Sequence, residues 1–145
     1  MTPVELERLW DNHLDGEFVS KDVEATLATM TDDASVDHIP VHTGGHGKDA
    51  LRAYYRDVFI PSWPDDLQQT PINRVIGDGQ VVDEIRTRFT HDRRMDWFLP
   101  GVPPTNKVVD IDIIVVVQFR DGKIACERIY WDQATVLRQV GLLEE

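Results

Sequence analysis

The sequence is short of cysteine, of long apolar runs and of basic residues. Its single cysteine, Cys126, cannot form an intrachain disulfide, which fits a reducing, cytoplasmic environment. No apolar run approaches the roughly 20 residues that a membrane-spanning helix needs. Residues 1–8 contain acids and no apolar core, so we read no signal peptide there. We therefore expect a soluble, cytoplasmic protein without a membrane partner.

Basic residues are outnumbered by acids, with 15 lysines and arginines against 26 aspartates and glutamates, which leaves a formal net charge of −11. A charge of this sign repels phosphate backbones, so we expect no nucleic acid partner. The glycines Gly44, Gly45 and Gly47 are not followed by the Lys-Ser/Thr pair of a phosphate-binding loop. We expect no cofactor.

Metal-ligand patterns are also scarce. His38, His42 and His46 are spaced by four, which would place them on one face of a helix, but Pro40 and Gly44 are incompatible with a helix there. No Cys or His-Glu partner pattern accompanies them. The sequence therefore predicts no metal site.

The length of 145 residues suits one domain, which we place at residues 1–145. A capping box at residues 2–5 starts a helix whose apolar positions recur at helical spacing and which we expect to end at Gly16. Ser20 is the expected cap of a second helix that ends near residue 31. The N-terminal part is therefore predicted to be helical.

A third helix is expected after a short strand at residues 34–39. It starts near Lys48, Pro61 prevents its continuation, and Tyr54 and Tyr55 lie on its buried stripe. A phenol hydroxyl on this stripe can hold a substrate oxygen, and core packing explains both tyrosines equally well. We include Tyr54 and Tyr55 among the candidate substrate-binding residues.

Four antiparallel strands are expected in the C-terminal half, as two hairpins with glycine-containing turns. The first hairpin covers 67–76 and 81–91, and the second covers 108–119 and 124–131. The long connection at 92–106 includes Trp97, which either closes over a pocket or packs against a partner subunit.

The second hairpin turns at Asp121-Gly122. A two-residue turn there pairs residues whose numbers sum to 243, so that Asp112 faces Trp131 and shares a face with Asp110. The first strand of this hairpin is apolar on both faces at its centre, so both faces need to be covered. We expect helices over one face and a second subunit over the other, which predicts a homodimer through the outer face of the sheet.

Short stretches in a characteristic order carry a family resemblance. They are His38-Ile39-Pro40, Thr43-Gly44-Gly45, Phe59-Ile60-Pro61, Val82-Asp83-Glu84, Phe89-Thr90-His91, Met95-Asp96-Trp97, Leu99-Pro100-Gly101, Pro104-Thr105 and Ile129-Tyr130-Trp131-Asp132-Gln133. With the order of predicted elements, they resemble the SnoaL-like, or nuclear transport factor 2-like, superfamily. The resemblance is sharper for the branch associated with dienelactone-hydrolase (carboxymethylenebutenolidase-type) proteins.

The resemblance implies an α+β fold, a cone-shaped barrel in which a curved antiparallel sheet wraps around three N-terminal helices. In the epoxide hydrolases and polyketide cyclases of the superfamily, an aspartate of the last strand acts as acid or base. Aligning the second aspartate of that pattern with Asp132 places Ile129 at the catalytic position. Asp132 itself, three residues before Thr135, is better explained as the N-cap of a last helix.

Asp112 is the candidate catalytic acid or base, because a carboxylate in an apolar pocket with Trp131 can have a raised pKa. The alternative is that Asp112 only bonds Trp131 or a backbone amide. Asp110, a candidate for substrate binding with Trp131 and Trp97, alternatively lies at the solvated end of its strand.

His38 and His91, each at the end of a strand, are the candidate proton donors at the mouth of the cone. The alternatives are ordinary hydrogen bonds, from His38 to the loop that follows it and from His91 to Asp92 or Asp96.

These candidates predict a cofactor-independent acid/base isomerase, cyclase or dehydratase acting on a compact apolar or aromatic ligand with a carbonyl or lactone group. The alternative is a non-catalytic ligand-binding or dimerisation module that assists a dienelactone-type hydrolase, because the superfamily fold hosts both kinds of protein.

Overall fold

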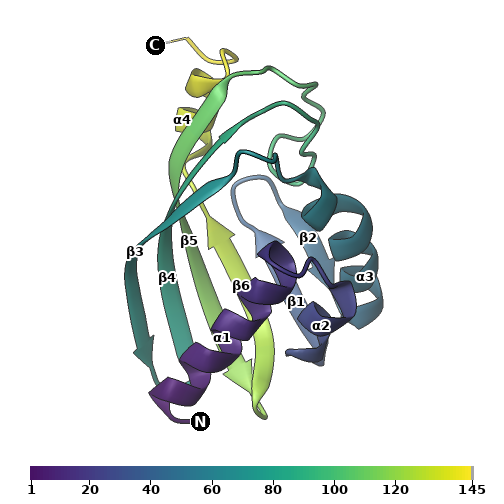
Figure 1. Ribbon diagram of the computed structural model, residues 1–145, viewed down its shortest axis with the longest axis vertical. Helices are drawn as coiled ribbons and strands as arrows, with labels where there is room; N and C mark the ends of the chain where they lie inside the picture. The colour runs from purple at the N-terminus through teal and green to yellow at the C-terminus, as the bar shows by residue number, and fades with distance from the viewer. Residues whose placement is uncertain (145) are drawn as a thin grey trace.

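The computed structural model describes residues 1–144 and shows helices packed on one side of a curved sheet (Figure 1). The predicted α+β class is confirmed. The regular elements are α1 (Pro3–Phe18), α2 (Val23–Ala28), β1 (Met30–His38), β2 (Thr43–His46), α3 (Lys48–Ala53), the π-helix η1 (Tyr54–Phe59), the 3-10 turn η2 (Ile60–Ser62), β3 (Gln68–Gly77), β4 (Gln80–Thr90), β5 (Val108–Arg120), β6 (Lys123–Tyr130) and α4 (Gln133–Gln139).

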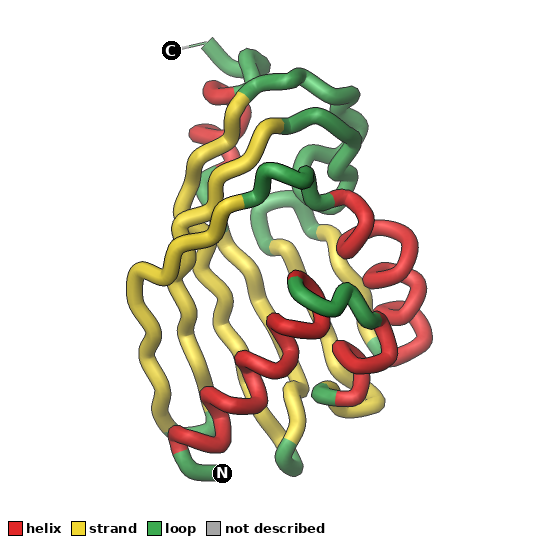
Figure 2. The backbone as a smooth tube through the Cα atoms, in the orientation of Figure 1, coloured by secondary structure: helices red, strands yellow, loops and turns green. Residues whose placement is uncertain are grey.

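The six strands form one open sheet in the order β2-β1-β6-β5-β4-β3. Neighbouring strands are antiparallel except β1 and β6, which run parallel. Helix α1 crosses the middle of the sheet, and α2 and α3 lie beside it over β1 and β2 (Figures 1 and 2). The core fills the space between these helices and the inner face of the sheet. No helix among residues 1–144 is long and apolar enough to cross a membrane.

The N-terminal helix begins as predicted and ends later than predicted. Thr2 and Glu5 form the capping box. Gly16 does not end the helix, which runs to Phe18; a Cβ atom on Gly16 would lie 2.6 Å from Thr26 Oγ1. Glycine is needed at this position because α2 packs directly against α1 there.

The second helix is shorter than predicted and has a different cap. The side chain of Asp22, and not that of Ser20, accepts a hydrogen bond from the backbone of Ala25 at its N-terminus. The helix ends at Ala28, because Met30 already belongs to β1, whose strand extends further toward the N-terminus than the sequence predicted.

The third helix changes its winding at Tyr54. After α3 the chain continues as one π-helical segment and a 3-10 turn that contains Pro61. A π-turn holds more residues than an α-turn, and here the side chains of Tyr54, Tyr55 and Phe59 are all buried. Both adjacent tyrosines therefore reach the interior.

The predicted register of the β5–β6 hairpin is wrong. A β-bulge between Gln118 and Phe119 shifts the pairing by one residue, so that Ile114 pairs with Tyr130 and Val115 with Ile129. A shift of one residue moves each side chain to the opposite face relative to its partner strand.

Because of this bulge, Asp110 and Asp112 lie on the outer face of the sheet, away from the helices. Arg86 Nε donates to Asp110 at 2.8 Å and Arg86 Nη1 to Asp112 at 3.0 Å, and Arg88 also pairs with Asp110. The face that includes Asp112 does not include Trp131, whose indole donates to Gln133. The predicted contact between these two residues is absent.

The long connection at residues 91–107 is an integral part of the core. Trp97, Phe98 and Leu99 are buried. The indole of Trp97 donates to Ser62 Oγ at 2.7 Å, and the hydroxyl of Thr43 donates to the Trp97 carbonyl. This connection therefore packs over one end of the interior.

Candidate functional site

A cavity of about 50 Å³ lies between α1 and the inner face of the sheet. Most of its wall is apolar, and the polar part consists of Glu17, His38, Gln69, Thr87 and Glu127. The apolar lining residues are Trp10, Leu14, Phe18, Phe59, Ile85, Trp97, Ile113, Val115 and Ile129. A space of this size has room for about four water-sized groups.

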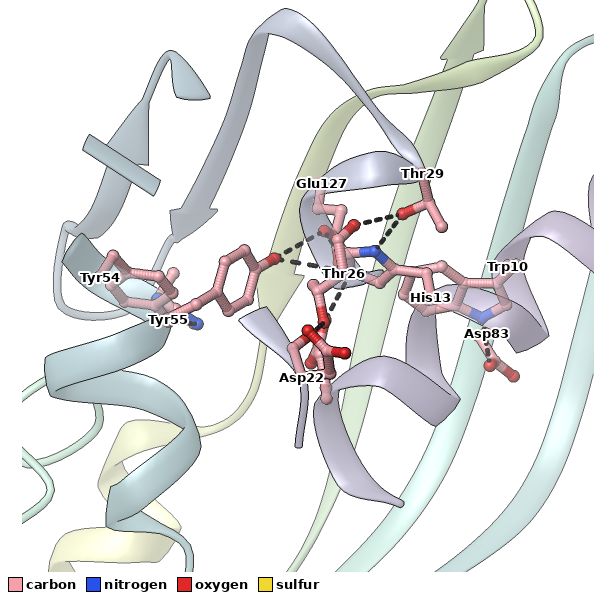
Figure 3. Close-up of polar contacts among 11 residues, drawn as sticks. Trp10, His13, Asp22, Thr26, Thr29, Tyr54, Tyr55, Asp83 and Glu127 are labelled. Carbon is pink, nitrogen blue, oxygen red and sulfur yellow. Dashed lines mark hydrogen bonds and ion pairs between the residues drawn. The ribbon is translucent and has the colours of Figure 1, made fainter. Parts of the chain in front are cut away.

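Two carboxylates of the wall meet at one histidine. His13 and Glu17 are one turn apart on α1, and His13 Nε2 lies 2.5 Å from Glu17 Oε1. Glu127 points inward from β6 and places Oε2 at 3.1 Å from the same nitrogen. Figure 3 shows His13 and Glu127 side by side at the centre of this group. We call His13, Glu17 and Glu127 the buried triad; none of its residues is more than 5% exposed.

Thr29 fixes the orientation of the His13 ring. Its hydroxyl donates to the carbonyl of Thr26 at 2.6 Å, so it has no second hydrogen for His13 Nδ1, which lies 2.8 Å away. Nδ1 therefore carries a hydrogen and donates it to Thr29 Oγ1. The other ring nitrogen, Nε2, is thereby directed at the two carboxylates.

Burial and charge act against each other on the His13 ring. Burial alone lowers the pKa of His13, but Glu127 and Glu17 together raise it to about 10. Burial also raises the pKa of the Glu17 carboxyl, which His13 partly offsets. His13 therefore keeps its proton at neutral pH, and the buried triad combines a protonated histidine with two carboxyl groups on the cavity wall.

Tyr55 extends the buried triad from the opposite side. Its hydroxyl donates to Glu127 Oε2 at 3.4 Å and lies 3.5 Å from His13 Nε2 (Figure 3). Burial raises the pKa of the Tyr55 phenol well above its usual value. The phenol therefore stays protonated and acts as a hydrogen-bond donor to the carboxylate.

His38 lines the cavity as a neutral ring. Thr43 donates its hydroxyl hydrogen to the Trp97 carbonyl, so Thr43 accepts from His38 Nδ1 at 3.2 Å. His38 Nε2 then accepts from the hydroxyl of Tyr54 at 3.1 Å. Burial lowers the pKa of His38 to about 4. Both ring nitrogens are engaged within the protein, so His38 shapes the wall and positions Tyr54.

The other predicted site residues are distributed over three places. Trp97 lines the cavity. Trp131 is not among the lining residues, and the centre of its ring lies 5.9 Å from the ring centre of His38, which is one of them. His91 is buried in the 91–107 connection, where its Nδ1 accepts from the backbone of Thr105 at 3.2 Å. Asp110 and Asp112 are on the outer face, for the reason given above. Of the three predicted catalytic residues, only His38 lines the cavity.

The buried triad was missed by the sequence analysis, although each member left a signal. His13 lies on the apolar stripe of the first helix, and Glu17 follows it at i+4 on the same stripe. Glu127 alternates with Ile129 on one face of its strand, which is the face assigned to the cavity by the position of Ile129. An acid at a stripe position, one turn after a histidine, is the informative pattern.

A surface groove adjoins the cavity. It has a volume of about 220 Å³ and shares four residues with the cavity, Leu14, Phe18, Gln69 and Ile85, which come from α1, β3 and β4. These residues therefore form the boundary between solvent and cavity.

Comparison with known proteins identifies relatives of the whole fold. The family model of the SnoaL-like domain matches residues 10–127. TsrD from Streptomyces laurentii has a TM-score of 0.76 at 17% identity, with 99% of both chains covered. A protein named as a SnoaL-like polyketide cyclase from Jannaschia sp. CCS1 has a TM-score of 0.78 at 18% identity, covering 97% of this chain and 94% of that one.

A further structure, named as a ketosteroid isomerase from Kribbella flavida DSM 17836, has a TM-score of 0.61 at 12% identity and covers 88% of this chain and 78% of that one. No curated protein matches the chain. At these identities the solved structures establish the fold and do not establish an activity.

Proposed function

The chain belongs to the SnoaL-like domain family, and from this premise we propose that it is a small-molecule enzyme that moves a proton on a compact carbonyl compound. Isomerisation, cyclisation and dehydration are the reactions of this type. The observation that carries the proposal is the pair of buried carboxylates, Glu17 and Glu127, on the wall of a mostly apolar cavity. Carboxyl groups in such surroundings are suited to proton transfer near neutral pH.

The polar groups of the cavity lie at its two sides. Glu127 comes from β6, whereas Thr87 comes from β4, two strands away in the sheet. Neighbouring strands are about 4.8 Å apart, so these side chains are separated by roughly 10 Å across the sheet. The β5 residues Ile113 and Val115 form the apolar wall between them.

This arrangement suits a ligand with an apolar body and one oxygen. In the proposed reaction Glu127 accepts the proton, and His13 holds the carboxylates in place through Nε2. Thr87 and Gln69 are the side chains placed to hold the substrate oxygen at the other side. Asp112, on the outer face, has no part in this proposal.

The second candidate is the non-catalytic ligand-binding or dimerisation module. It is favoured by Ile129, an apolar residue on the cavity wall where the resemblance to related enzymes implies an acid. The proposed dimer interface in that case is the outer face of the sheet, where Ile114 and Tyr130 are exposed. We also propose that the protein is cytoplasmic. Neither candidate function depends on this location.

Hydrogen exchange at carbon separates the two candidates. The protein is incubated in D2O with a panel of compact cyclic ketones and lactones, and loss of the α-proton signals is followed by NMR. We expect accelerated exchange for at least one compound, and a reduction of about 10²- to 10⁴-fold in Glu127→Gln. Asp112→Asn is the matched control, with an equivalent acid-to-amide change on the outer face, and should exchange at the wild-type rate.

Equal rates in both variants would exclude Glu127 as the base. Binding of panel compounds without any exchange, seen as a change in tryptophan fluorescence, would favour the non-catalytic candidate.

A further inference from the structure

The buried acids of this protein differ in how their charge is compensated. Among residues 1–144 no lysine or arginine is buried, whereas Glu17, Asp83 and Glu127 are. Asp83 accepts from Arg74 Nη2 at 2.9 Å and from the Trp10 indole at 2.8 Å. Glu17 and Glu127 have His13 as their shared partner for charge.

The buried triad has more acids than bases. The carboxyl groups of Glu17 and Glu127 share one histidine, and a negative charge that His13 does not balance is unfavourable in a dry interior unless another counter-charge is close. The described residues that line the cavity include no lysine or arginine to provide it.

The remaining wall is suited to a positive charge. Four aromatic side chains, Trp10, Phe18, Phe59 and Trp97, line the same cavity as the two carboxylates. The faces of aromatic rings attract cations, and cages of such rings are typical sites for methylated ammonium groups. In the groove outside, Arg74 is the one basic lining residue, and Glu7, Asp11 and Asp83 neutralise it.

We propose that the cavity binds a small organic cation, an ammonium group with apolar substituents that lies between the carboxylates of Glu17 and Glu127 and the aromatic wall. The volume of about 50 Å³ has room for about four water-sized groups, so part of a larger ligand lies in the adjoining groove. This inference rests on the same site as the proposed function and names its ligand class, namely a compound that carries a cationic nitrogen.

The experiment compares three ligands of nearly equal shape and different charge. Choline, the neutral 3,3-dimethyl-1-butanol and the anionic 3,3-dimethylbutanoate are titrated into the full-length protein at pH 7.5. Binding is followed by tryptophan fluorescence, since Trp10 and Trp97 line the cavity, and by calorimetry. We expect choline to bind at least about tenfold more tightly than the alcohol, and the carboxylate to bind most weakly.

Variants show whether the buried triad is responsible. Glu127→Gln should weaken choline binding at least about tenfold and leave binding of the neutral alcohol unchanged, which also shows that the cavity is intact. Asp112→Asn should bind choline like the wild type. Equal affinities for choline and the alcohol, or choline binding that is unaffected in Glu127→Gln, would overturn the inference.

Zn²⁺ alone is added in a separate titration, because His13, Glu17 and Glu127 are close enough together to ligate a metal ion. Stabilisation by Zn²⁺ that is lost in His13→Gln, without choline binding, would identify a metal site instead and would overturn the organic-cation inference. The readout is binding and not turnover, so a failure here leaves the carbon-exchange test of the proposed function intact. A failure of that test equally leaves this one intact.

Discussion

Two groups of acidic residues lie on opposite faces of the sheet and differ in their partners. On the outer face, Asp110 and Asp112 pair with Arg86 and Arg88, and all four side chains are at least 33% exposed. On the inner face, Glu17 and Glu127 are buried and share His13. The outer group is therefore screened by water, whereas the charges of the inner group are compensated by their contacts with His13.

The difference follows from dielectric surroundings and not from residue type. Exposed ion pairs contribute between 0 and about 1 kcal/mol, because water solvates their charges in both the folded and unfolded states. Removing one partner of a buried group leaves an uncompensated charge, which costs roughly 3–5 kcal/mol. Acidic side chains of the same chemistry therefore contribute little to stability on the outer face, whereas on the inner face they form a candidate reaction centre.

The largest expected effect concerns His13. In His13→Leu the side chain keeps a similar size but becomes apolar, so Glu17 and Glu127 lose their shared partner. We expect the free energy of unfolding, measured by urea denaturation at pH 7, to fall by about 3–5 kcal/mol. Adding Glu17→Gln and Glu127→Gln removes both charges and should recover part of this loss. A His13→Leu variant as stable as the wild type would show that the inner group is not electrostatically coupled.

The next effect is a pH dependence from His38. Its pKa is about 4 in the folded state, against 6.5 for the free side chain. As the pH falls from 7 to 5, the unfolded state takes up a proton that the folded state does not, so stability decreases by roughly 2 kcal/mol. In His38→Gln this part of the pH dependence should disappear.

His46→Gln is the control for that measurement, because His46 is an exposed histidine paired with Asp37. Urea denaturation at pH 7, 6 and 5 gives the change in the free energy of unfolding with pH for the wild type, His38→Gln and His46→Gln. If His38→Gln and the wild type lose stability in parallel over this range, His38 is not held neutral by burial.

The smallest effect is expected on the outer face. Arg86→Met keeps an extended side chain and removes the ion pairs to Asp110 and Asp112. We expect a change in the free energy of unfolding that is much smaller than that of His13→Leu and is reduced further in 0.5 M NaCl, since salt screens exposed charges. A loss comparable to that of His13→Leu would contradict the distinction between the two faces.

Several elements were predictable because their signals are local. The capping box at Thr2 and the N-cap at Asp132 rest on side chains that bond backbone groups three residues away, and both are present. The hairpin turns and the helix before Pro61 were predictable as well, because the glycines of the turns and the proline are also local signals. The end of α1 was not, because Gly16 is used for contact with Thr26, which belongs to another helix.

The sequence by itself determined the α+β class, the order of the elements other than β2, which was expected to be a loop, and the apolar faces, because capping, turn chemistry and hydrophobic periodicity act over a few residues. Only the tertiary structure decided which acids face the cavity. A single bulge at Gln118–Phe119 places Asp112 outside, and the crossing of α1 over β6 brings His13 and Glu17 to Glu127. Strand register and helix crossing depend on packing across the whole core, so no short stretch of sequence specifies them.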